Sequence, residues 1–240
     1  MKYVILDERT PKKAIAALKA RGFLPFLLPP FERLDAPVAS HPDMLMFFGD
    51  RIFCNREYFE AAKDVISAIS EALGLPAEAG GEKISKDYPN DIAYNALSVG
   101  SFVFAKLDCL APNISDYAKR AGLTAVDVKQ GYAKCSACRV GERAIITADA
   151  SIKKAALAHG IDVLLIKSEG VSLDGYDCGF IGGASGDDGE NVYFCGNIDL
   201  HPDAEKIKAF CKAHGKTPVS LTDEPLYDVG TMFFFQTERA

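Results

Sequence analysis

Residues 141–167 read GERAIITADASIKKAALAHGIDVLLIK and contain a complete structural unit. A glycine and a polar residue precede the apolar run AIIT, which is typical of a strand that follows a hairpin turn. The next residues, rich in Ala and Lys, predict a helix that stops at Gly160, where a left-handed residue commonly ends a helix. The apolar run DVLLIK then predicts a further strand.

The same unit recurs along the chain at intervals of roughly 40 to 55 residues, the spacing of a repeat architecture. Its hairpin glycines and following strands are GDRIFCN from Gly49, GSFVFAK from Gly100 and GENVYFC from Gly189. Its helices end at Gly74, Gly122 and Gly215. We therefore expect repeated β-hairpin, helix and strand units.

The two ends of the chain supply a fifth copy. Residues 2–8, KYVILDE, are followed by a helical pattern that ends at Gly22 and by the strand FLPFLL, but no first strand precedes them. The C-terminal run GTMFFFQ from Gly230 provides that strand. Pairing of the two ends would close a ring and remove exposed sheet edges. The alternative is an ordinary α+β domain in which strands and helices alternate without closure.

Composition restricts the functional classes. Of the 240 residues, 48% are hydrophobic and 25% charged, as in ordinary globular domains, and the net charge is −6. No basic run is present, which argues against nucleic-acid binding. No uninterrupted apolar segment is long enough for a membrane span, and the charged N-terminus does not match a secretory signal. Seven cysteines without framework spacing favour a reduced, cytoplasmic protein.

This arrangement resembles the pentein fold, the five-bladed ββαβ propeller of guanidine-modifying hydrolases and amidinotransferases. The motifs HPD, YPNDIAYN, GYAKC and GFIGGASG suggest an uncharacterised bacterial branch of that superfamily. The resemblance implies an α/β fold, a pseudo-symmetric five-bladed ring closed by its terminal strands, in a single domain of residues 1–240. The superfamily also contains a non-catalytic, ribosome-associated factor.

In such a ring the first strand of each unit starts near the axis, so polar residues ahead of the hairpin glycines should converge there. The candidates are His41, Asp43, Asn90, Asp91, Asn95, Lys134, Cys135, Asp177 and Asp228. Unpaired buried carboxylates are costly, so several around one cavity imply a cationic ligand, a metal or solvent.

The glycine-rich run GFIGGASG, residues 179–186, is not a phosphate-binding loop, because no Gly-Lys-Ser/Thr and no helix follow it. We interpret it as the first strand of the fourth unit. There Gly182 and Gly183 would let a ligand or a neighbouring strand approach the backbone closely. A bulged hairpin without any ligand is the alternative.

The tripeptide His-Pro-Asp occurs twice. At residues 201–203 it precedes a helical pattern, so we interpret it as a helix cap. At residues 41–43 we expect no helix, and the motif resembles the His-x-Asp of pentein hydrolases, which implies an acid/base role for His41 with Asp43 orienting it. A structural histidine is the alternative.

Cys135 and Cys138 form the motif CSAC, which lacks the partners of a zinc site and the helix N-terminus of a redox pair. On a strand the two would point to opposite faces, and we expect Cys135 to face the centre. The resemblance implies a nucleophilic cysteine, although the family carries it in the last unit and Cys135 lies in the third. Cys178 is another candidate for the reactive thiol.

Two functions are compatible with these residues. The first is a hydrolase or transferase in which Cys135 attacks the guanidinium of a small cationic substrate, His41 transfers protons, and Asn95, Asp177, Asp228, Gly182 and Gly183 bind the substrate. We expect no cofactor and no metal for this chemistry. The second is a non-catalytic ring that binds a small ligand or a protein partner.

Overall fold

The computed structural model describes residues 1–237, and within them five small sheets share one design. In each sheet a first strand pairs antiparallel with a middle strand, and a third strand runs parallel to the middle one. A helical crossover connects the middle and third strands, as a parallel pair requires. The strand and helix order that the repeat predicts is thereby confirmed. None of the sheets closes into a barrel.

The units follow one another along the chain. The first contains β3 Met46–Phe48, β4 Ile52–Asn55, α3 Arg56–Ala61, α4 Lys63–Leu73 and β5 Ala77–Gly80. The second contains β6 Leu97–Val99, β7 Phe102–Ala105, α5 Pro112–Arg120 and β8 Thr124–Asp127. The third contains β9 Ala137–Arg139, β10 Ala144–Thr147, α6 Ala150–Ala158 and β11 Asp162–Leu165. The fourth contains β13 Ser185–Asp187, β14 Asn191–Phe194, α7 Ala204–Ala213 and β15 Thr217–Ser220.

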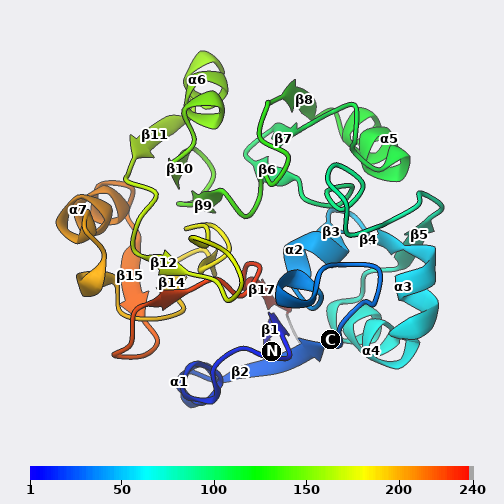
Figure 1. The fold of residues 1–240 in the computed structure, drawn as a ribbon, viewed down its shortest axis with the longest axis horizontal. Coiled ribbons are helices and arrows are strands. Elements are labelled where there is room, and N and C mark those ends of the chain that lie inside the picture. Colours follow the sequence, from blue (N-terminus) through cyan, green and yellow to red (C-terminus); the bar gives the residue numbers. More distant parts are fainter. Residues whose placement is uncertain (238–240) are drawn as a thin grey trace.

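The fifth unit joins the two ends of the chain. It contains β17 Phe233–Gln236, β1 Lys2–Asp7, α1 Lys12–Ala20 and β2 Phe23–Leu28. Lys2 lies opposite Gln236 and Ile5 opposite Phe233 in the antiparallel pair β1–β17. The predicted pairing of the terminal strands is confirmed, and Figure 1 shows β1 and β17 close to each other.

Left-handed glycines end the crossover helices. Gly74 follows α4 with a φ of 66°, a conformation that places no Cβ penalty on glycine. The glycines at the ends of the other four helices have φ values between 68° and 85°. These residues turn the chain back into the third strand of each unit, as the sequence predicts.

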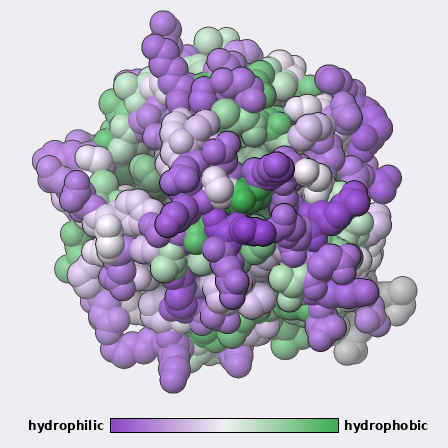
Figure 2. Space-filling model, turned by 45° about the vertical axis from the view of Figure 1, so that its right-hand side comes forward, coloured by the Kyte–Doolittle hydropathy of each residue, from purple (hydrophilic) through white to green (hydrophobic). Residues whose placement is uncertain are grey.

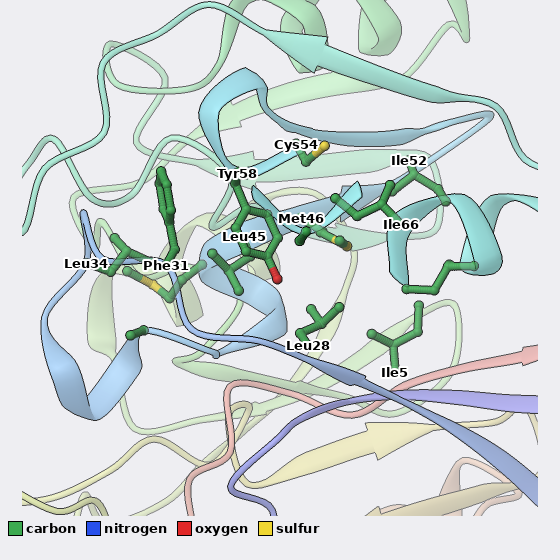
Figure 3. Packing of buried hydrophobic residues seen from close by; sticks show 14 of the residues in the cluster. Ile5, Leu28, Phe31, Leu34, Leu45, Met46, Ile52, Cys54, Tyr58 and Ile66 are labelled. Carbon is green, nitrogen blue, oxygen red and sulfur yellow. The ribbon is translucent and has the colours of Figure 1, made fainter. Parts of the chain in front are cut away.

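The crossover helices of the units lie around the outside of the molecule and the short first strands lie toward its centre (Figure 1). Buried apolar side chains fill the space between neighbouring units. Figure 3 shows one such cluster, in which Ile5 and Leu28 of the fifth unit pack with Ile52 and Ile66 of the first. Leu45 belongs to this cluster, so the segment that precedes β3 is fixed in place.

Three expectations about local structure are wrong. Residues 42–45 form a short helix, α2 Pro42–Leu45, with His41 at its N-cap, because Pro42 suits a first turn. Cys135 lies in a turn before β9 and not on a strand. In GFIGGASG, residues 181–184 form a turn, and only Ser185 and Gly186 of that run belong to β13.

Further short elements lie between the units. These are the 3₁₀ helices η1 Ala36–Val38 and η2 Ile198–Leu200, and a two-stranded parallel sheet of β12 Val171–Ser172 and β16 Leu226–Tyr227. The face of the molecule drawn in Figure 2 is mainly hydrophilic, with scattered hydrophobic areas. Among residues 1–237, no helix combines the length and apolar character needed to cross a membrane.

Candidate functional site

The segments that precede the first strands of the units meet at the centre of the molecule. His41 and Asp43 come from the segment before β3, Asn95 from that before β6 and Cys135 from that before β9. Asp228 lies ahead of β17. These five side chains are each at most 5% exposed, so their polar groups depend on one another rather than on solvent.

The side chain of Asn95 contacts both the side chain and the backbone of Cys135. The Asn95 Nδ2 atom lies 3.0 Å from Cys135 Sγ. The Asn95 Oδ1 atom accepts hydrogen bonds from the backbone N–H groups of Lys134 at 2.8 Å and Cys135 at 3.3 Å. This contact fixes the turn and directs an amide donor at sulfur, an arrangement that favours a thiolate over a thiol.

The imidazole of His41 lies between two carboxylates. Its Nδ1 atom is 3.9 Å from Asp228 Oδ1, and its Nε2 atom is 3.8 Å from Asp7 Oδ2. Asp7 forms an ion pair with Arg9, and Asp228 accepts backbone hydrogen bonds from Phe180 and Gly230. Sequence reasoning missed Asp7, the last residue of β1.

Asp43 contacts Thr231 and is not one of the two carboxylates beside His41. Its Oδ2 atom accepts a 2.7 Å hydrogen bond from the hydroxyl of Thr231, and Lys134 Nζ donates to the same hydroxyl oxygen at 3.2 Å. Thr231 has a φ of 70°, which is rare for a β-branched residue and costs on the order of 1–3 kcal/mol. The structure therefore places Asp43 beside Thr231, while Asp7 and Asp228 approach His41. Thr231 was not among the residues singled out from the sequence.

One cavity of about 120 Å³ opens onto the predicted nucleophile and base. Its lining includes His41, Cys135 and Asp228. Its other walls are formed by Val38, Met44, Tyr132, Leu173, Tyr176, Cys178 and Phe180. A mostly apolar wall with a few convergent polar groups is typical of a small-molecule site.

The electrostatic environment keeps the thiol and the imidazole neutral when the cavity is empty. Burial raises the pKa of Cys135 well above its ordinary value, and the carboxylates of Asp43 and Asp228 raise it further. Burial, with a smaller contribution from Arg9, lowers the pKa of His41 to about 3. Burial and the nearby Asp43 raise the pKa of Asp228 to about 7. A cation in the cavity would oppose the carboxylates and favour the thiolate.

These pKa shifts predict opposite effects of pH on stability. The pKa of Asp228 is about 7 against an ordinary 3.8, so its contribution is present below pH 3.8 and is lost as pH rises through 7. The pKa of His41 is about 3 against 6.5, so its contribution is present above pH 6.5 and is lost as pH falls through 3. In His41→Asn only the contribution of Asp228 to the pH dependence of stability remains, and in Asp228→Asn only that of His41 remains.

As pH rises from 4 to 6.5, we therefore expect the free energy of unfolding of His41→Asn to decrease relative to that of the unmodified chain. That of Asp228→Asn should increase over the same range. Each slope should differ from that of the unmodified chain by up to about 1.4 kcal/mol per pH unit. Urea unfolding at several pH values measures these slopes. Parallel profiles for all three proteins would contradict the assignment.

The remaining predicted residues lie around this centre in different ways. Gly182 and Gly183 pack against it, because the Gly183 N–H donates to the Cys135 carbonyl at 2.9 Å. Asp91 accepts a 2.6 Å hydrogen bond from Tyr132, which lines the cavity. Asn90 and Asp177 are exposed and are not among the cavity-lining residues.

Cys138 has different neighbours from Cys135. It lies on β9 and packs in an apolar cluster with residues such as Ile146 and Phe194. All seven cysteines are free thiols. Within residues 1–237, no group of three or more His, Cys, Asp or Glu side chains is placed to hold a metal ion.

Comparison with known proteins shows the family and the fold. Residues 5–233 match the family described as Family of unknown function (DUF6873), and the chain belongs to that family. No curated protein matches the chain.

Two solved structures have a similar α/β fold. One is DDAH from Pseudomonas aeruginosa, a cysteine-to-serine mutant complexed with citrulline, at 11% identity and a TM-score of 0.55, covering 91% of each chain. The other is SxtG, an amidinotransferase of the saxitoxin biosynthetic pathway from Microseira wollei, at 13% identity and a TM-score of 0.52. That match covers 86% of this chain and 72% of the other. At 11% and 13% identity, these matches show a shared fold.

Proposed function

We propose that this member of the DUF6873 family is a cysteine-dependent enzyme that acts on the guanidinium group of a small cationic substrate. The observation that carries the proposal is a single cavity lined by Cys135, His41 and Asp228. A nucleophile, a proton carrier and an anion on one cavity wall are the groups that attack on a charged C–N centre requires.

The proposal includes a finer description of the fold. We infer that the five three-stranded sheets are blades of a pseudo-symmetric ββαβ propeller in one domain, which the shared strand order and the β1–β17 pair support. We also infer a cytoplasmic location, which the seven free thiols support because thiols persist in a reducing compartment.

The proposed reaction has two stages. Cys135 gives its proton to His41, and its sulfur forms a bond to the guanidinium carbon. The C–N bond to the leaving amine breaks, and His41 protonates that amine. In a hydrolase a water molecule then gives a proton to His41 and attacks the same carbon, which releases the thiol and a ureido product. In a transferase an acceptor amine replaces the water.

Substrate binding activates the thiol in this scheme. Besides burial, the carboxylates of Asp43 and Asp228 raise the pKa of Cys135. A bound guanidinium that neutralises these carboxylates therefore lowers the pKa of Cys135. Asn95 Nδ2, 3.0 Å from Cys135 Sγ, also stabilises the thiolate. Gly182 and Gly183 allow the backbone to approach the site closely. We assign no role to Asp177, which is exposed and outside the cavity wall.

Alkylation with two reagents of equal size tests the proposal. 2-Chloroacetamidine carries a positive charge like a guanidinium, and 2-chloroacetamide is neutral. We expect the cationic reagent to modify Cys135 at least tenfold faster, because Asp228 attracts the amidinium and the cation favours the thiolate. Mass spectrometry of peptides locates the modified cysteine and gives its rate.

Two variants complete the experiment. Cys135→Ser should remove the fast reaction, and Cys178→Ser, which changes another thiol on the same cavity wall, should leave it unchanged. A fast reaction at Cys178 alone, or equal rates with both reagents at Cys135, would contradict the proposal. A panel of guanidino compounds, assayed for ureido products, then identifies the substrate.

The second candidate function is a non-catalytic module that binds a cationic ligand. The raised pKa of Cys135 and the lowered pKa of His41 favour it, since neither group is activated in the empty cavity. Under this hypothesis guanidino compounds bind in the cavity without turnover and protect Cys135 from alkylation.

A further inference from the structure

A second cavity lies along the first strands themselves. The segments before β3, β9, β13 and β17 line the candidate active cavity. A separate cavity of about 180 Å³ is lined by residues of β3, β6, β9, β13 and β17 themselves. The two cavities share no lining residue. Lys134 lines the second cavity and its neighbour Cys135 lines the first, so the chain between them separates the two spaces.

The walls of the second cavity are strongly aromatic. Phe47 and Phe48 lie on one side, and Phe233, Phe234 and Phe235 of β17 also contribute. The rings of Phe48 and Phe233 are 4.9 Å apart between centroids, as are those of Phe48 and Phe235. Such walls suit the flat apolar body of a small organic molecule.

The charged groups of this cavity do not balance. Its lining contains the cations Lys134 and Arg139 and one carboxylate, Asp187. Asp187 is already occupied, because it accepts hydrogen bonds from the backbone N–H groups of Gly141 and Gly189 and lies 3.5 Å from Arg139 Nε. Lys134 therefore provides positive charge that no carboxylate of the cavity wall neutralises.

Lys134 also retains hydrogen-bonding capacity. An ammonium has three N–H donors, and the hydrogen bond described for Lys134 Nζ goes to the hydroxyl of Thr231. The ammonium lies 5.7 Å from the centre of the Phe233 ring, beside the aromatic wall. Asp43 shares the Thr231 hydroxyl with Lys134, and its carboxylate opposes the lowering of the Lys134 pKa that burial causes. A carboxylate entering the cavity would meet a charged donor next to apolar rings.

We propose that this cavity binds a small organic monoanion, with its carboxylate on Lys134 and its apolar body against the phenylalanine rings. The site is distinct from the candidate active cavity, which presents carboxylates and suits a cation. The proposal does not depend on the enzymatic function, because binding itself is the readout.

Calorimetry with benzoate tests the proposal. We expect saturable binding of benzoate that is at least tenfold tighter than that of benzamide, which has the same ring without the charge, and of benzylamine, which carries the opposite charge. Lys134→Met keeps the length of the side chain but removes the ammonium, and it should weaken benzoate binding at least tenfold. Lys154→Met, on the exposed face of α6, is the matched control and should bind benzoate as the unmodified chain does.

Ser98→Leu provides a second variant, since it fills the cavity from β6 and leaves every charge in place. It should also weaken benzoate binding at least tenfold. The proposal is overturned if benzoate does not bind saturably below about 10 mM, which corresponds to roughly 3 kcal/mol. Equal affinities for benzoate and benzamide would overturn it too, as would unchanged benzoate affinity in Ser98→Leu or in a folded Lys134→Met.

Discussion

A chain that ends at Gly230 is expected to lose cooperative unfolding. The deletion removes β17, whose residues pair with Lys2 to Ile5 of β1. It also removes the ring of Phe234, which lies 4.8 Å from Tyr193 and 5.0 Å from Phe23 between centroids. Phe233, Phe234 and Phe235 are partly buried, and full burial of a large apolar side chain contributes roughly 1.5–3 kcal/mol. Together with the β1–β17 pairing, the loss is therefore a large part of the stability of an ordinary domain, about 5–15 kcal/mol.

Circular dichroism and urea unfolding measure this effect. A chain that ends at Thr237 is the control, because it retains all of β17 and the hydrogen bond from the Thr237 N–H to the Met1 carbonyl. We expect the control to unfold in one transition and the shorter chain to show none. If the shorter chain melts at the temperature of the control, the terminal pair is not required for the fold.

The sequence was sufficient to predict the unit and the pairing of the two chain ends, because both depend on local rules. Helix-ending glycines such as Gly74 need a left-handed conformation, and apolar runs such as AIIT need a buried strand. The missing first strand of the N-terminal unit could be sought only at the other end of the chain. The small sheet of β12 and β16 was not predicted, because two residues per strand leave no periodic pattern.

The first strands were predicted less well. The apolar run at residues 44–48, MLMFF, is one pattern in the sequence, but the chain uses it as the end of α2 followed by β3. A short apolar run does not distinguish a helical turn from a strand, and Pro42 decided in favour of the turn. The same shortening moved Cys135 from a strand into a turn.

The candidate site was predicted from one rule, that polar residues ahead of the first strands converge. The rule includes Asn95, Cys135 and Asp228, which lie together in the structure. It omits Asp7, because that residue ends a middle strand and reaches His41 from another direction. It also omits Thr231, whose positive φ places its hydroxyl toward Asp43 and leaves no trace in the sequence.

Gly182→Ala and Gly183→Ala are expected to perturb the site strongly, because each adds a methyl group where neighbouring atoms leave no space for it. A Cβ on Gly183 would lie 1.9 Å from Asp228 Oδ1, a carboxylate held by two backbone N–H groups. A Cβ on Gly182 would lie within 2.5 Å of the carbonyl oxygens of Lys134, Cys135 and Ala137. Neither glycine has a positive φ, so the cost comes from contact alone.

The two substitutions should differ in their consequences. Backbone carbonyls cannot rotate away, so Gly182→Ala should cost at least about 3 kcal/mol of unfolding free energy, the upper part of the range for overpacking. In Gly183→Ala the Asp228 side chain can move, at a smaller cost of about 1–3 kcal/mol, but it then leaves the cavity wall. Gly183→Ala should therefore also abolish the preference of Cys135 for the cationic alkylating reagent.

Gly81→Ala is the matched control, because no atom lies within 4 Å of the added Cβ and its φ is not positive. Urea unfolding of the three variants gives the free energies, and the two chloroacetyl reagents give the rate ratio at Cys135. If Gly182→Ala were as stable as Gly81→Ala, the turn before β13 would not be packed against the Cys135 turn. If Gly183→Ala kept the full rate ratio, Asp228 would not be the group that attracts the cation, and the guanidinium would have to be recognised by Asp43.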